Sequence, residues 1–118
     1  MQSKWGHLLK LPNPDRAVVD IEKLTEYALN PTHPSGRHKA RVFASALGLT
    51  AQDSEFLRDV LLEKALSEDA FEEPITDYGS RFVIDFELTT EYGTATIRCA
   101  WIVRSDEDFP RLTTCYVV

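Results

Sequence analysis

The sequence is poor in the residues that build metal centres and disulfide frameworks. It holds two cysteines and three histidines in 118 residues. Because neither cysteine belongs to a C-x-x-C pair, we expect free thiols at Cys99 and Cys115. No zinc-binding spacing, H-E-x-x-H, glycine-rich phosphate loop or G-x-S-x-G motif is present. We therefore expect no metal and no cofactor; a metal site improvised from the three histidines is the minor alternative.

Long apolar runs are also absent. None approaches the roughly 20 residues that span a bilayer, and the first residues lack the apolar stretch of a signal peptide. A cytoplasmic protein without membrane contact is therefore the default expectation. The net charge of −6 argues against broad nucleic-acid affinity, which depends on neutralising phosphates. It is compatible with a small basic site on an acidic body.

One stretch departs from this acidic character. Residues Asn30–Gly48 read NPTHPSGRHKARVFASALG and contain no acid, since Glu26 is the last acid before them and Asp53 the next. The ionisable side chains of the stretch are His33, Arg37, His38, Lys39 and Arg41. Such a group suits an anionic ligand or proton transfer. The alternative interpretation is a solvated, positively charged helix end.

The first half of the chain shows the apolar spacing of helices. Helices are expected over residues 20–29, over residues 36–47 and from Asp53 to about Ser67. Their predicted N-terminal caps are Asp20, Ser35 and a Thr50-x-x-Asp53 capping box. Gly48 ends the second helix, and Phe56 is among the residues that the third should bury.

After Gly79 the hydrophobic period changes from 3.6 to 2, which predicts strands. Three are expected, over residues 81–88, 94–104 and 111–118, with a further short strand within 68–79 or at 17–19. Short turns between consecutive strands favour antiparallel pairing. The sequence thus predicts one α+β domain over residues 1–118, with N-terminal helices packed on a three- or four-stranded antiparallel sheet. In it, 1–19 is an arm, 20–67 the helical part and 80–118 the sheet.

Simple alternation along these strands places several polar side chains on the face opposite the large apolar residues. They are Arg81, Arg98, Arg104, Arg111 and Thr113, whereas Thr114 and Tyr116 have the other parity. The arginines could be cross-strand partners of Asp85 or Glu87. Alternatively, with histidine and lysine they could cleave RNA without a metal. That reaction needs a base for the 2′-hydroxyl, an acid for the leaving oxygen and cations for the phosphate.

Residues Asn30–Ala40 fit the pattern N-P-x-H-P-x-G-x-x-K-A, and Tyr78–Gly79, Ala100–Val103 and Arg111–Thr114 accompany it. With these motifs, residues 21–118 resemble a family of bacterial domains of unassigned activity, found alone and at the C-termini of polymorphic toxins. The family is similar to a compact barnase–EndoU–colicin–RelE nuclease fold. That fold implies helices first, then an antiparallel sheet that holds RNA.

The resemblance implies a catalytic group at the motif positions, namely His33, Lys39, Arg111 and Thr114. His33 would be the general acid or base, and Lys39 and Arg111 would contact the phosphate. Arg37, His38, Arg41 and Trp101 are the expected binding residues. The implied function is a metal-independent, toxin-type ribonuclease.

The alternative is a non-catalytic interaction or regulatory module of a bacterial toxin or stress system. Nine acids against two basic residues in the span 53–77 favour it, and so do strand edges that could pair with a second copy. Its partner would be a cognate protein or a homodimer mate. From the residues alone, whether the chain is an enzyme stays open.

Overall fold

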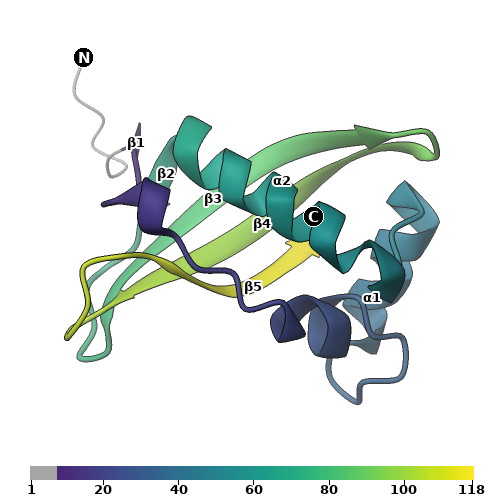
Figure 1. Cartoon of the computed structure of the whole chain (residues 1–118), viewed down its shortest axis with the longest axis horizontal. Helices are drawn as coiled ribbons and strands as arrows, with labels where there is room; N and C mark the ends of the chain where they lie inside the picture. Colours follow the sequence, from purple (N-terminus) through teal and green to yellow (C-terminus); the bar gives the residue numbers. More distant parts are fainter. Residues whose placement is uncertain (1–7) are drawn as a thin grey trace.

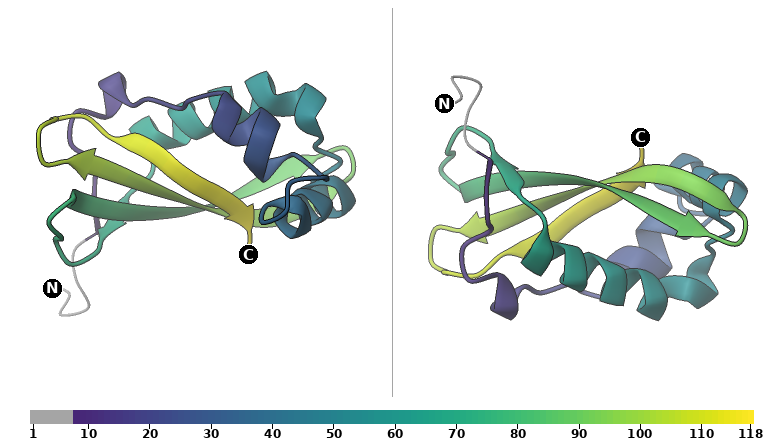
Figure 2. Two further views of the ribbon diagram at one scale, coloured as in Figure 1. Left: turned by 90° about the horizontal axis from the view of Figure 1, so that it is seen from below. Right: turned by 90° about the horizontal axis from the view of Figure 1, so that it is seen from above.

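The structure is a computed structural model that describes residues 8–118, so the first seven residues of the predicted arm, with the third histidine, His7, lie outside the described part. The long helix of residues Ser54–Ser67 covers one face of an antiparallel sheet, and the helix of residues Arg37–Leu47 lies at the end of the sheet beside the C-terminus (Figures 1 and 2). The predicted α+β class is confirmed. The elements in chain order are β1 (Leu8–Leu9), η1 (Pro14–Arg16), η2 (Leu24–Ala28), α1 (Arg37–Leu47), η3 (Ala51–Asp53), α2 (Ser54–Ser67), β2 (Ala70–Glu72), β3 (Gly79–Thr90), β4 (Gly93–Arg104) and β5 (Arg111–Val117).

The sheet has the order β1-β2-β3-β4-β5, so each strand pairs with its neighbour in sequence. The hairpin of β3 and β4 forms its centre, with paired residues from Gly79 opposite Arg104 to Thr90 opposite Gly93. The short strand predicted within residues 68–79 is β2. The two-residue β1 adds an edge strand that the sequence pattern did not predict. Residues 17–19 form only an isolated parallel bridge.

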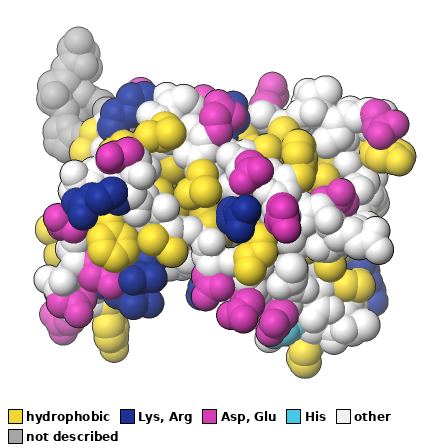
Figure 3. Space-filling model, in the orientation of Figure 1, with side chains coloured by type: hydrophobic (Ala, Val, Ile, Leu, Met, Phe, Trp, Pro, Cys, Tyr) yellow, Lys and Arg dark blue, Asp and Glu magenta, His cyan; other side chains and the backbone are white. Residues whose placement is uncertain are grey.

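The core lies between the helices and one face of the sheet. The side chains that alternate toward that face are fully buried, as the period of two predicts: Ile84, Ile97, Cys99, Trp101 and Cys115. The helices cover them with Phe43, Leu47, Leu57 and Leu61, each with no exposed surface. Acidic, basic and apolar side chains are interspersed on the outer side of the helical layer (Figure 3).

Helices α1 and α2 confirm the predicted second and third helices. Gly48 ends α1 in the left-handed region at φ 70°, and the Thr50–Asp53 capping box is present at the start of η3. The prediction that Phe56 is buried was wrong, because Leu57 and Leu61 face the sheet and turn Phe56 outward to 47% exposure. No helix within residues 8–118 has the length and apolar character needed to cross a membrane.

The predicted first helix is different in kind. Its main part is a five-residue π-helix, η2, in which the Leu29 N–H donates to the Leu24 carbonyl at 2.9 Å. The Thr25 hydroxyl also donates to the Ile21 carbonyl at 3.3 Å, a side-chain bond that bends helices. Asp20 does accept the Glu22 N–H, as a cap would. Isolated π-turns occur mostly as bulges and often at functional sites.

Candidate functional site

Lys39 occupies an unusual position where η2, α1 and β5 meet. Its ammonium Nζ lies 5.3 Å from the centre of the Tyr27 ring and 5.0 Å from that of Tyr116. It also donates to the Thr114 hydroxyl at 3.4 Å. Within residues 8–118 it takes part in no ion pair. Neither Asp85 nor Glu87, the carboxylates expected to pair with basic side chains of the sheet, neutralises Lys39.

Lys39 lies in a cleft of about 540 Å³ between the helical segment and the edge of β5. His33 and Thr114 line the same cleft, so three of the four predicted catalytic residues come together. Sequence reasoning missed the rest of the lining: Asp20, Glu22, Lys23, Glu26, Tyr27 and Thr113. The sequence held one signal for them: most of these residues lie in the helical segment directly before the basic stretch, and so were close to it along the chain.

His33 shapes the loop that precedes α1. Its Nδ1 accepts the backbone N–H groups of Ser35 and Gly36, each at 2.9 Å. The prediction that Ser35 caps α1 was wrong: Gly36 is the N-cap residue and no side chain caps it. The imidazole instead binds donors in the turn just before the helix. Asn30 holds the start of the loop by accepting the Thr32 N–H at 3.0 Å.

A larger residue at position 36 is excluded by a close contact with Tyr27 and not by the backbone conformation. The φ of Gly36, −91°, suits any residue, but a Cβ there would lie 2.5 Å from the Tyr27 carbonyl oxygen. The loop therefore packs directly onto η2. This contact places Tyr27 beside His33, and the two rings meet edge to face with centroids 4.7 Å apart.

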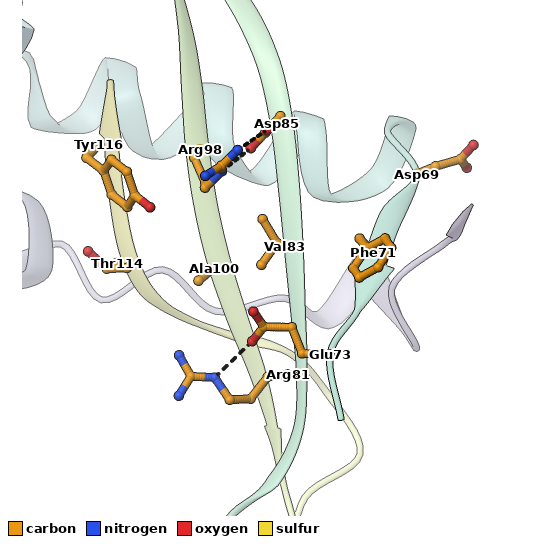
Figure 4. A pocket seen from close by; sticks show the side chains of 10 residues that line it. All are labelled: Asp69, Phe71, Glu73, Arg81, Val83, Asp85, Arg98, Ala100, Thr114 and Tyr116. Atoms are coloured by element: carbon orange, nitrogen blue, oxygen red, sulfur yellow. Dashed lines mark hydrogen bonds and ion pairs between the residues drawn. The ribbon is translucent and has the colours of Figure 1, made fainter. Parts of the chain in front are cut away.

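A β-bulge in β5 decides which side chains of that strand reach the site. Ala100 pairs with Thr114 but Trp101 pairs with Leu112, so Thr113 is the extra residue. Beyond the bulge, Thr114 and Tyr116 lie on the open face of the sheet, together with Arg98 and Ala100 (Figure 4). Simple alternation gave the opposite parity. It failed because a bulge reverses the faces of the residues that follow it.

The open face of the sheet is a shallow pocket of about 630 Å³ whose charges are already paired. Arg98 binds its cross-strand partner Asp85 through two bonds of 2.8 Å (Figure 4). Arg81 lies 3.6 Å from Glu73. Asp85 raises the pKa of Arg98. Arg98 matches the predicted cross-strand pairing with Asp85, whereas Arg81 pairs with Glu73 instead of Asp85 or Glu87. Phe71, Val83 and Ala100 supply the apolar part of the pocket.

Arg111 does not join the cleft in the way that the resemblance implied. Its guanidinium makes two bonds to Glu107, at 2.8 and 2.9 Å, and lies over the Phe109 ring. Glu107 raises the pKa of Arg111, and Arg111 lowers that of Glu107. The reason is local: the turn before β5 supplies a carboxylate four residues earlier. The charge of Arg111 is therefore neutralised within its own turn.

The four expected binding residues do not line the cleft. Trp101 is fully buried and its indole N–H donates to the Cys99 sulfur at 3.3 Å, so it is a core residue. The guanidinium of Arg37 donates to the Pro34 carbonyl. His38 and Arg41 are exposed. Helical spacing separates these two from Lys39, which borders the buried side of α1.

The two cysteines are cross-strand partners in the core, and both thiols are free. Burial raises the pKa of each thiol to about 12. Since the thiolate is the reactive form, neither cysteine is a nucleophile at neutral pH. Within residues 8–118, no cluster of histidine, cysteine and carboxylate side chains is suited to hold a metal ion.

Alkaline pH should destabilise the fold through these thiols. They stay protonated in the folded state up to about pH 12 but ionise near pH 9 once unfolded. The unfolded state therefore gains stability as the pH rises from 9 toward 12. Urea titrations across this range should show the free energy of unfolding falling more steeply for the wild type than for a Cys99→Ala/Cys115→Ala variant. Equal slopes would contradict the burial of the thiols.

Comparison with known protein families places the chain in one of them. No curated protein matches the chain. A family model described as a domain of unknown function, DUF6883, matches residues 10–118. The match includes η2, the loop, α1 and β5, which are the elements that form the Lys39 cleft. The chain therefore belongs to the DUF6883 family.

Proposed function

We propose that this protein is a metal-independent, toxin-type ribonuclease-like domain whose centre is Lys39. The observation that carries the proposal is the half-buried ammonium of Lys39, which is held by two tyrosine rings and a hydroxyl rather than by a carboxylate. A cation that is positioned but not neutralised can bind an anion. Proteins use such groups to stabilise charge that develops in a transition state.

The lining of the cleft supplies the other groups that RNA cleavage needs. A carboxylate of Asp20, Glu22 or Glu26 can accept the proton of a ribose 2′-hydroxyl. The 2′-oxygen then forms a bond to phosphorus while the bond to the 5′-oxygen breaks. The leaving 5′-oxygen takes up the proton that the carboxylate accepted, directly or through a water molecule. The products are a 2′,3′-cyclic phosphate and a 5′-hydroxyl. Lys39 would stabilise the negative charge on the phosphoryl oxygens during this step.

The charge balance of the site predicts weak binding of RNA. The cleft holds three carboxylates and two lysines, and the arginines of the open face are paired with acids. Only one or two phosphates would therefore be neutralised. We expect the logarithm of the RNA binding constant to fall with that of the salt concentration with a slope of about −1. A fluorescence anisotropy titration over a range of salt measures this slope, and a slope steeper than about −4 would place the RNA elsewhere.

Removal of the Lys39 ammonium should abolish most of the activity. Incubation of the purified protein with single-stranded and structured RNA in EDTA should give 2′,3′-cyclic phosphate ends. Lys39→Ala should lower the rate by about 100-fold or more, the usual effect of removing one transition-state donor. Lys64→Ala is the matched control, because Lys64 also lies over an aromatic ring, that of Phe86, but outside the cleft.

The outcomes of this assay are distinct. Equal cleavage by the wild type and Lys39→Ala would identify a contaminating nuclease. Loss of cleavage in both Lys39→Ala and Lys64→Ala would indicate damage to the fold. An inactive wild type that also fails to bind RNA at low salt would overturn the proposal.

The second candidate is a non-catalytic interaction module, which the open sheet face favours. Its arginines are paired with acids, while Phe71 is 40% exposed beside Val83 and Ala100. A neutral face with apolar side chains suits a protein partner better than a polyanion. Sedimentation of the wild type beside Phe71→Ser measures self-association through this face. A monomer at all concentrations would remove the homodimer form of this candidate.

A further inference from the structure

The hydrogen bonds of His33 restrict what its imidazole can do. Nδ1 is the acceptor for two backbone N–H groups, from Ser35 and Gly36. A ring nitrogen that accepts such bonds carries no proton, so the neutral ring has its proton on Nε2. Action as a base would require a free Nε2 and a proton on Nδ1. Action as an acid would require protons on both nitrogens. In either state Nδ1 carries a proton. Its N–H would then point at the backbone N–H groups of Ser35 and Gly36, and both hydrogen bonds would be lost.

The same imidazole is the first link in a series of contacts that ends at Lys39. Its ring meets Tyr27 edge to face at 4.7 Å, and Gly36, whose N–H it binds, packs on the Tyr27 carbonyl. Tyr27 in turn presents its ring to the Lys39 ammonium at 5.3 Å. A change in the His33 side chain therefore alters the packing of Tyr27, and through it the surroundings of Lys39.

We propose that His33 is a positioning residue, fixed as the Nε2–H tautomer, that holds Lys39 in place through Tyr27 and transfers no proton. Only one part of this proposal, that His33 transfers no proton during cleavage, rests on the proposed function. The tautomer and the placement of Lys39 can be tested on the protein alone. If the proposal is right, proton transfer in the cleft is left to groups other than His33, such as the three carboxylates.

The tautomer is tested by NMR on protein labelled with ¹⁵N in histidine. In its neutral form, the His33 ring should show one pyridine-like nitrogen at Nδ1 and one protonated nitrogen at Nε2. His38, which is exposed and accepts no such bonds from residues 8–118, should show the average of its two exchanging tautomers. A protonated Nδ1 at His33 would overturn the proposal.

The positioning role is tested with two substitutions. In His33→Asn the amide oxygen can accept the same two N–H groups, whereas His33→Ala has no acceptor. The rate at which an acylating reagent modifies Lys39, followed by mass spectrometry, should change about threefold or more in His33→Ala. It should return toward the wild-type value in His33→Asn. His38→Ala is the matched control, and circular dichroism confirms that each variant is folded.

RNA cleavage separates this proposal from the proposed function. If His33 only positions, His33→Asn should keep cleavage within about threefold of the wild type while His33→Ala loses more. If His33→Asn loses cleavage although Lys39 is modified at the wild-type rate, then His33 carries a proton. The positioning role is then wrong, while the ribonuclease stands. If the wild type cleaves no RNA, the proposed function fails, and the tautomer and the Lys39 rates still decide the role of His33.

Discussion

Replacing Trp101 with alanine is expected to lower the free energy of unfolding by about 4 kcal/mol. The side chain lies on the central strand β4 and has no exposed surface. Its removal loses the transfer free energy of the largest core side chain and leaves a cavity between the sheet and the helices. The Cys99 sulfur also loses the hydrogen bond that the indole N–H donates to it. Urea unfolding followed by far-ultraviolet circular dichroism measures the change.

A conservative variant separates packing from ligand binding at Trp101. Trp101→Phe keeps most of the apolar volume, so it should cost less than half as much and leave the protein folded. Because Trp101 does not line the Lys39 cleft, RNA binding by Trp101→Phe should equal that of the wild type. A loss of RNA binding in this folded variant would restore Trp101 as a binding residue.

Gly36→Ala is expected to lower the free energy of unfolding by about 3 kcal/mol, the upper range for overpacking a close contact. The added Cβ would lie 2.5 Å from the Tyr27 carbonyl oxygen, which is backbone and cannot rotate away. The loop would have to move off η2, and His33 and Tyr27 would separate. The surroundings of Lys39 should therefore change along with the stability. Urea unfolding and the rate of Lys39 acylation measure the two effects.

Ser35→Ala is the matched control for Gly36→Ala, since it makes the neighbouring residue an alanine at an exposed position. Its effect should stay within about 0.5 kcal/mol. A glycine replaced by alanine at a site with room usually gains about 0.4–1 kcal/mol through the unfolded state. A stabilised Gly36→Ala variant would therefore show that the loop does not press on Tyr27.

The sequence by itself determined most of the architecture. The spacing of apolar residues gave α1 and α2, and the change of period after Gly79 gave β3, β4 and β5. These features follow from local geometry, because 3.6 residues per helical turn and two per strand repeat are read directly along the chain. The basic stretch was also visible as sequence. It drew attention to His33 and Lys39, which line one cleft.

Only the tertiary structure decided what those residues contact. The bulge at Thr113 turned Thr114 and Tyr116 toward the site. Contact with η2 placed the Tyr27 ring against Lys39 and the imidazole of His33 against backbone donors. Arg111 is paired with Glu107 and does not line the Lys39 cleft. These outcomes depend on contacts across the fold, on the conformation of the turns before α1 and β5, or on one extra residue in a ladder, and hydrophobic period carries no information about any of them.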